Sequence, residues 1–276
     1  MEEGLAATFG ATSMVLFTQP IDTIKVNHQQ LVGSSSTPLR TALSYVRKTS
    51  LSALWAGLTP SLSAYVVEHA ILFGCYGSLK QQVYPNSNGS PFGLGLICGA
   101  STLVSSLAMC PLDALKCNMQ VTGVSLRTLI QSNGIWWMWS NYTNIVARDS
   151  VFFSFYVGVN AALCKHWLAS KTSSKHYCDL TLVERFLFGG VSGAVAWTAA
   201  SPFDVVNSRR QAQVLNSTKK KSYSFVSELL TTVRVEGILT LYRGYSLSVL
   251  RGFFGYGMFT LVYELSLKSL KPSLNW

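Results

Sequence analysis

Six long apolar stretches alternate with polar stretches along this chain. None offers the roughly 18 uninterrupted apolar residues of a plain membrane span, so as spans they must turn polar side chains toward one another or toward water. Polar loops with short amphipathic segments join them in pairs. The pattern predicts an all-α protein with long helices at approximately 4–30, 58–82, 92–120, 142–167, 184–212 and 245–270.

A proline motif ends the first, third and fifth of these stretches. It reads Pro20-Ile21-Asp22-Thr23-Ile24-Lys25, then Pro111-Leu112-Asp113-Ala114-Leu115-Lys116, then Pro202-Phe203-Asp204-Val205-Val206-Asn207. The prolines are 91 residues apart both times, and a glutamine follows nine residues after each, as Gln29, Gln120 and Gln211. A single such hexapeptide would mean little, but three in constant register predict internal repeats.

A second shared feature precedes the second apolar stretch of each repeat. Equivalent places hold Trp55-Ala56-Gly57, Trp139-Ser140-Asn141 and Tyr242-Arg243-Gly244. The distance from the proline to the glycine position is 37, 30 and 42 residues, so the middle repeat has room for at most a short connecting helix. We expect one domain over 1–276, with repeats at approximately 1–90, 91–180 and 181–276.

Composition supports a membrane setting. Charged residues make up 12% of the chain, about half the usual share of a soluble domain, and the mean hydropathy is +0.28. The six cysteines show no CxxC spacing, which argues against a zinc site and a disulfide framework. The acidic start, Met1-Glu2-Glu3, lacks the features of a cleaved leader, so any targeting signal is expected to be internal. The net charge of +10 fits anionic lipid, an anionic ligand or scattered loop lysines.

The triple motif resembles the mitochondrial carrier family, and the likeness covers the whole chain. The resemblance implies six tilted transmembrane helices in a pseudo-threefold barrel around a water-filled cavity, with proline-kinked odd-numbered helices converging at the matrix end. It also implies a monomeric, multi-pass protein of the mitochondrial inner membrane that carries a small molecule and binds membrane lipid such as cardiolipin, without a cofactor. Peroxisomal and plastid members share the motif, so those membranes stay open as alternatives.

The acids and bases of the proline motifs are the expected inner gate. Residues i and i+3 are neighbours on a helix, and in a threefold bundle each acid can meet the base of the next helix. The expected pairs are Asp22 with Lys116, Asp113 with position 207, and Asp204 with Lys25. Asn207 stands where the family has a base, which weakens one pair. By resemblance, Gln29, Gln120 and Gln211 brace the pairs.

The outer gate is expected to be weak. The family's motif of tyrosine, acid and, three residues later, base survives only in pieces. The matching positions are Tyr76, Gly77 and Lys80 in the first repeat, Asn160, Ala161 and Cys164 in the second, and Tyr263, Glu264 and Leu267 in the third. Only Lys80 and Glu264 can pair, so we expect a carrier that is able to return empty.

Charged positions near mid-span are the candidate substrate ligands. Counting seven residues beyond each Gly57-equivalent gives Ala64, Arg148 and Arg251, with Asp149 beside Arg148 and Glu68 one turn beyond Ala64. Ionised side chains are costly in lipid, so we expect them to face the cavity. Two bases for a carboxylate and two acids for cationic groups suit a zwitterion. Alternatively, Arg148 with Asp149 and Arg251 with Glu68 merely neutralise one another.

The resemblance narrows the substrate class. An arginine beside an acid on the fourth helix is typical of the family's amino-acid and carnitine carriers, where a tryptophan like Trp197 lies near the ligand. The second stretch, "VVEHAILFGCYGSLKQQV", is similar to that of the ornithine carriers. Glu68 therefore favours a basic amino acid: Arg148 takes the α-carboxylate, Asp149 the α-ammonium and Glu68 the distal cation. Arg251 contributes to the carboxylate or to gating, and His69 departs from the expected amide.

Other function classes have less support. The chain shows no nucleophile motif, no metal-spaced cluster and no phosphate-binding glycine loop, so we expect neither an enzyme nor a metalloprotein. Lys219-Lys220-Lys221 is read as a solvated or lipid-facing run, and we expect no nucleic-acid partner. Two alternatives stay open: a carnitine or acylcarnitine carrier, and a degenerate carrier-fold protein acting as an adaptor or a proton leak.

Overall fold

The computed structural model describes most of the chain. The described residues are 2–30, 54–55, 58–85, 89–121, 131, 134–170, 180–216, 225–242 and 245–270. Several side chains within these helices lie outside the description, chiefly those of 22–30, 113, 115–121 and 207–216.

Six long helices make up the described body of the molecule, two in each expected repeat. They are α1 Glu2–Gln30, α3 Leu58–Val83, α4 Pro91–Val121, α6 Tyr142–Ser170, α7 Leu182–Asn216 and α9 Tyr245–Leu270. The six predicted helices are thereby confirmed, with every boundary within four residues of its expected place. Shorter elements precede two of them: η2 Ile135–Trp139 lies before α6, and α8 Phe225–Glu236 and η4 Ile238–Tyr242 lie before α9.

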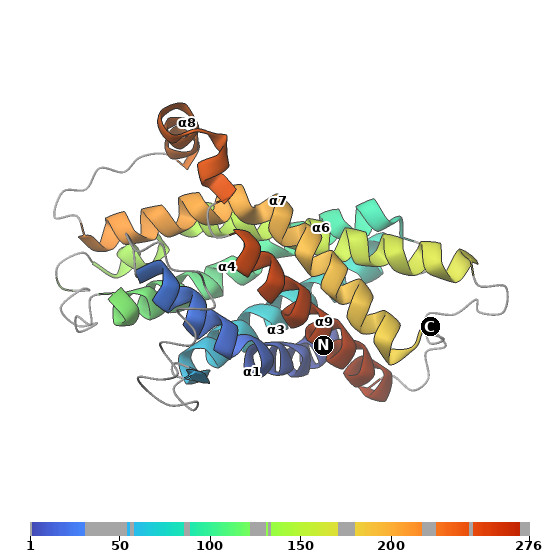
Figure 1. Cartoon of the computed structure of the whole chain (residues 1–276). Helices are drawn as coiled ribbons and strands as arrows, with labels where there is room; N and C mark the ends of the chain where they lie inside the picture. Colours follow the sequence, from blue (N-terminus) through green and yellow to red (C-terminus); the bar gives the residue numbers. More distant parts are fainter. Residues whose placement is uncertain are drawn as a thin grey trace.

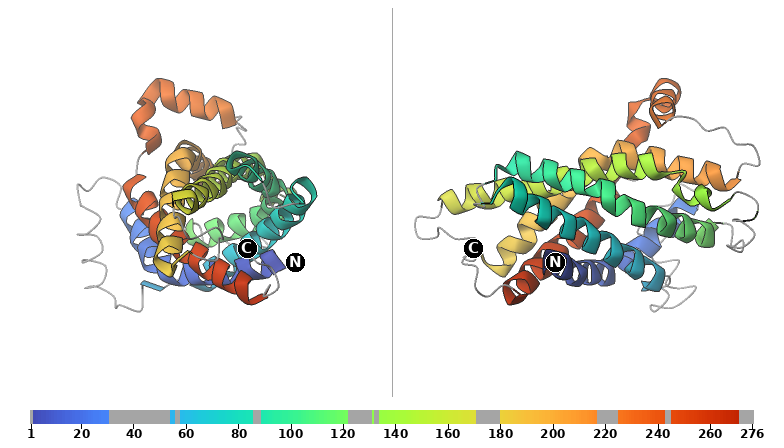
Figure 2. Two further views of the ribbon diagram at one scale, coloured as in Figure 1. Left: turned by 90° about the vertical axis from the view of Figure 1, so that its right-hand side faces the viewer. Right: turned by 180° about the vertical axis from the view of Figure 1, so that it is seen from behind.

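The long helices form a closed ring. Each packs against the next in chain order, and α1 completes the ring by packing against α9. Figure 2 shows this arrangement in the view along the bundle. Figure 1 shows α8 standing apart from the bundle, above the left part of α7. The second, fourth and sixth long helices, α3, α6 and α9, lie in three different expected repeats.

Small residues let neighbouring helices approach closely. A Cβ on Gly193 of α7 would lie 2.6 Å from the carbonyl oxygen of Gly252 on α9, and one on Gly189 would collide with Thr260. A Cβ on Gly99 of α4 would similarly collide with Ser154 of α6. Close backbone approach of this kind supplies much of the packing energy between helices in lipid.

Two tryptophans compensate for the helix prolines. Proline has no N–H, so the carbonyl four residues before it loses its helical donor. The indole Nε1 of Trp55 donates to the Leu16 carbonyl oxygen at 3.3 Å, four residues before Pro20. Trp139 Nε1 donates in the same way to the Leu107 carbonyl oxygen at 3.1 Å, four residues before Pro111. In the first two repeats, the tryptophan found in the sequence therefore ties the connecting segment to the proline-containing helix.

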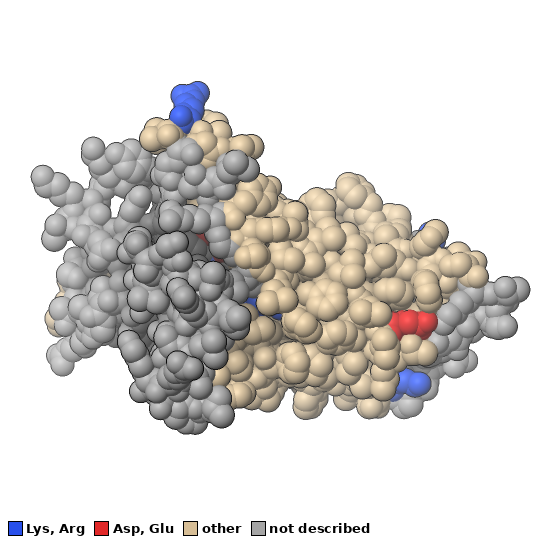
Figure 3. Space-filling view, viewed as in Figure 1, with Lys and Arg blue, Asp and Glu red and all other residues tan. Residues whose placement is uncertain are grey.

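The outside of the ring is apolar. Leu5, Phe9 and Leu16 of α1 each expose about half of their surface, and most of the described surface in Figure 3 is free of charged side chains. By length and composition alone, the described segments Pro91–Leu112 and Leu182–Val206 are apolar enough to cross a membrane. The other long helices carry more polar residues, and the cavity accounts for several of these.

Candidate functional site

A cavity lies inside the ring and is lined by residues of α3, α6, α7 and α9. The cavity has a volume of about 100 Å³ and is partly open to solvent. Charged and aromatic side chains share the lining. The lining residues are Tyr65, Glu68, Arg148, Asp149, Phe152, Phe153, Trp197, Asp204, Arg251 and Tyr256.

One side of the cavity is built around Arg148. Its Nε donates to Asp149 Oδ1 at 2.7 Å, within α6. Its Nη1 lies 3.8 Å from Asp204 Oδ1 of α7. Asp149 is 6% exposed, so its charge depends on this guanidinium for compensation. The arginine therefore links two carboxylates from different helices while part of its fork still faces the cavity.

A second group of lining residues is built around Glu68 of α3 and Arg251 of α9. Arg251 Nη2 donates to the Tyr65 hydroxyl at 2.7 Å, and its guanidinium carbon lies 5.6 Å from the centre of the Tyr65 ring. Glu68 is 4% exposed. Tyr256 interacts electrostatically with Glu68, Tyr65 and Arg251, which places the four groups together. This group thus offers a carboxylate and a guanidinium that is held by a tyrosine.

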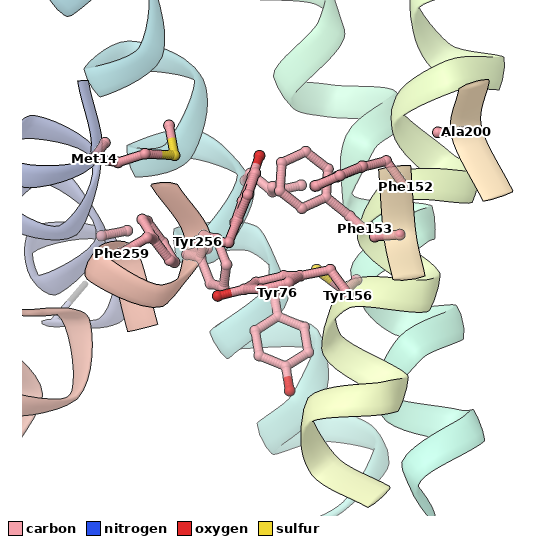
Figure 4. Packing of buried hydrophobic residues seen from close by; sticks show 14 of the residues in the cluster. Met14, Tyr76, Phe152, Phe153, Tyr156, Ala200, Tyr256 and Phe259 are labelled. Carbon is pink, nitrogen blue, oxygen red and sulfur yellow. The ribbon is translucent and has the colours of Figure 1, made fainter. Parts of the chain in front are cut away.

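Aromatic rings close the cavity toward the C-terminal ends of α3, α6 and α9. We call this set the aromatic cluster: Phe73, Phe153, Tyr156, Tyr256, Phe259 and Tyr263. Phe73 of α3 lies 5.2 Å from Phe259 of α9 and 6.4 Å from Phe153 of α6 between ring centres. Tyr156 of α6 lies 4.8 Å from Tyr256 of α9. Figure 4 shows several of these rings packed together. The three repeats therefore meet here through side chains.

His69 lies within the aromatic cluster. It is 1% exposed, and its ring centre lies 5.1 Å from that of Phe259 and 5.6 Å from that of Phe153. Nδ1 donates to the Tyr65 carbonyl oxygen at 2.9 Å, which assigns the proton of a neutral ring to Nδ1. Nε2 is then a buried acceptor without a hydrogen-bond partner. A polar atom inside the closure costs free energy as long as the rings stay packed.

The structure brings most of the predicted substrate ligands together. Glu68, Arg148, Asp149, Arg251 and Trp197 all line the cavity, whereas Ala64 is buried and is not among the described lining residues. Their role in binding stays a prediction. Sequence reasoning missed Tyr65, which neighbours Ala64 and precedes Glu68 by one helical turn. It also missed the approach of Asp204 to Arg148.

The inner gate lies largely outside the described residues. The helices run through all three proline motifs, but the side chains of Asp22, Lys25, Gln29, Asp113, Lys116, Gln120, Asn207 and Gln211 are outside the description. Asp204 is described, and the cation beside it is Arg148. The expected pairing of Asp204 with Lys25 stays a prediction.

At the other end, Glu264 of α9 bonds Arg185 of α7, a partner that sequence reasoning did not consider. The Lys80 ammonium lies 5.8 Å from the centre of the Tyr76 ring on its own helix. The pairing of Lys80 with Glu264 stays a prediction.

A ring of paired helices around a charged internal cavity is the architecture of a multi-pass membrane carrier of small solutes. The chain belongs to the Mitochondrial carrier protein family, whose sequence profile matches residues 1–88, 87–172 and 179–273. It is accordingly a multi-pass protein of the mitochondrial inner membrane.

Individual relatives are distant but cover nearly the full length. The chain is 28% identical to Mitochondrial substrate carrier family protein S of Dictyostelium discoideum, with 98% of each chain covered. It is 27% identical to Mitochondrial ornithine transporter 1 of Mus musculus, over 98% of this chain and 95% of the relative. Mitochondrial glutathione transporter SLC25A40 of Danio rerio is also 27% identical, over 77% of this chain and 63% of the relative.

Proposed function

We propose that this carrier transports basic amino acids such as ornithine, lysine or arginine. The charge balance of the cavity carries the proposal. Among the described residues, the lining holds two guanidiniums, Arg148 and Arg251, and three carboxylates, Glu68, Asp149 and Asp204, so these five side chains carry a net charge of −1 if all are ionised. A basic amino acid at neutral pH carries +1 and neutralises this lining. A net-neutral zwitterion such as carnitine leaves it at −1, and a dicarboxylate raises the excess of negative charge.

The two groups of lining residues match the two ends of such a molecule. The α-carboxylate binds the Arg148 guanidinium, and the α-ammonium lies against Asp149 and Asp204, which flank that guanidinium. The distal cation reaches Glu68, next to Arg251 and Tyr65. Ion pairs in so enclosed a site are stronger than in water, although desolvation offsets part of the gain. Likeness to an ornithine transporter over nearly the whole length also supports the proposal.

Alternating access is proposed as the mechanism. The aromatic cluster closes the cavity on one side, so in this form substrate enters from the proline-motif side. Binding stabilises the transition in which the six acid and base positions of the proline motifs pair and the aromatic cluster opens. We propose exchange of internal for external substrate by a monomer, with membrane lipid such as cardiolipin on its outer surface.

Uptake into liposomes tests the proposal. Purified protein is reconstituted with internal lysine, and labelled ornithine, lysine and arginine are compared with carnitine and glutathione, while an internal pH dye records proton flux. We expect rapid uptake of the three basic amino acids and little of the others. Carnitine uptake without ornithine uptake would favour the carnitine alternative. Proton flux without any solute uptake would favour the leak.

A further inference from the structure

Glu3 occupies space that belongs to another helix. It lies in the first turn of α1 and is 6% exposed. A Cβ added to Gly77 of α3 would lie 2.6 Å from Glu3 Oε2 and 3.3 Å from Glu3 Cβ. The carboxyl group of Glu3 therefore fills the volume that any side chain at position 77 would need. Position 77 is also the place where an acid was expected from the sequence pattern.

Lys80 is a cation that acts on this carboxyl group. It follows Gly77 by three residues on α3, and it interacts electrostatically with Glu3. Glu3 Oε2 is buried and has no hydrogen-bond partner, so a nearby positive charge favours its ionised form. Lys80 and Glu3 lie on neighbouring helices of one repeat.

The third repeat shows the same arrangement with the charges reversed. Arg185 lies in the first turn of α7, is 7% exposed and bonds the Glu264 carboxylate of α9. Its Nε also donates to the Leu180 carbonyl oxygen at 3.1 Å, which fixes the guanidinium. Leu267, where the sequence pattern led us to expect a base, is buried and apolar. Here again the first long helix of the repeat, α7, supplies the charge that its neighbour α9 lacks.

We propose that Glu3 and Arg185 are positioning residues of the outer gate, and that they hold Lys80 and Glu264 within their own repeats. Ion pairs at this end then join helices that stay together, and contact between repeats is made by the aromatic cluster. Opening the outer end separates aromatic rings and leaves both ion pairs intact. This inference does not depend on the identity of the solute.

Double-mutant cycles on purified protein in lipid-containing detergent test the proposal through the melting temperature. The first cycle combines Glu3→Gln with Lys80→Met, and the second combines Lys80→Met with Glu264→Gln. We expect the melting-temperature changes to be non-additive in the first cycle and additive in the second. Additivity in the first cycle, or strong coupling in the second, would overturn the proposal. Glu2→Gln is the matched control, because Glu2 is adjacent and exposed, and it is expected to leave the melting temperature unchanged.

A rescue experiment separates charge from packing. Glu3→Ala frees the space over Gly77, so Gly77→Glu in the same chain returns a carboxylate to that volume from α3. We expect Glu3→Ala alone to lower the melting temperature by several degrees and the double variant to recover most of the loss. Gly77→Gln in the Glu3→Ala chain is the neutral comparison. If Gly77→Glu restores the melting temperature no better than Gly77→Gln does, the charge of Glu3 has no role. If the Glu3 variants do not fold, a cycle of Arg185→Met with Glu264→Gln decides: coupling supports the proposal and additivity refutes it.

Discussion

Replacing Glu68 by glutamine removes one of the three carboxylates of the cavity and keeps the size of the side chain. Glu68 is 4% exposed and lines the same cavity as Arg148 and Asp149. An ammonium about 4 Å from this carboxylate gains about 4 kcal/mol at an effective dielectric constant near 20. Glutamine keeps a neutral hydrogen bond, so we take about 2 kcal/mol as the net loss for a cationic substrate.

That loss corresponds to about a 30-fold rise in KM, since about 1.4 kcal/mol is a factor of ten. A net-neutral zwitterion makes no ion pair with Glu68, so its KM should change by about twofold or less. The assay is exchange into proteoliposomes over a range of external concentrations, with ornithine and carnitine measured on the same preparation. Glu68→Asp keeps the charge on a shorter side chain and should fall between wild type and Glu68→Gln. Equal losses for ornithine and carnitine would show that Glu68 is structural and that the charge argument is wrong.

Three further predictions concern closure and stability. Trp139→Phe removes the donor to the Leu107 carbonyl and should lower the melting temperature by a few degrees, because one such hydrogen bond contributes about 1 kcal/mol. The control is Trp136→Phe, at a site 80% exposed, which should leave the melting temperature unchanged. Asn207→Lys should complete the inner gate, raise the melting temperature and change the exchange rate; if both stay at wild-type values, position 207 takes no part in the gate. His69→Leu removes a buried nitrogen without a partner, so it should raise the melting temperature and slow exchange, and a drop in melting temperature would mean that the ring nitrogen is needed.

Local signals in the sequence were enough to predict the helices. The proline motifs and the glycine positions marked where spans end and begin, and the repeat placed them in common register. α1 begins two residues earlier than expected because Glu2 and Glu3 are acidic residues in its first turn, where the helix dipole favours them. α7 continues four residues beyond 212 because its last residues, Gln-Val-Leu-Asn, contain neither proline nor glycine.

The sequence predicted the level of the site along the helices, but it did not predict which side chains face the cavity or reach one another. Counting along the helices put Arg148, Asp149 and Arg251 at one level, and the cavity contains all three. The same count assigned Ala64, but a helix turns by about 100° per residue, and its neighbour Tyr65 faces the cavity instead. The sequence assigned Asp204 to the inner gate, deeper along the helices than Arg148. The long Arg148 side chain nevertheless reaches it.

The partners of the outer charges escaped sequence reasoning for a related reason. The sequence motif lacks a charge at Gly77 and at Leu267. It does not indicate which neighbouring helix supplies the missing charge. Glu3 and Arg185 lie far from those positions in the sequence, at the starts of other helices. Only the packing of α1 on α3 and of α7 on α9 brings them together.

The excess of one carboxylate in the cavity has a consequence for how voltage acts on the protein. With a +1 solute bound, the lining residues Glu68, Asp149, Asp204, Arg148 and Arg251 together with their cargo carry no net charge. If the proposed function holds, and counting these described residues alone, the loaded transition moves no charge through the membrane field, while the empty one moves −1, which is about 2.3 kcal/mol for each 100 mV. Under the proposed function we therefore expect one-for-one exchange of such solutes to be electroneutral, with the membrane potential acting mainly on the unloaded carrier.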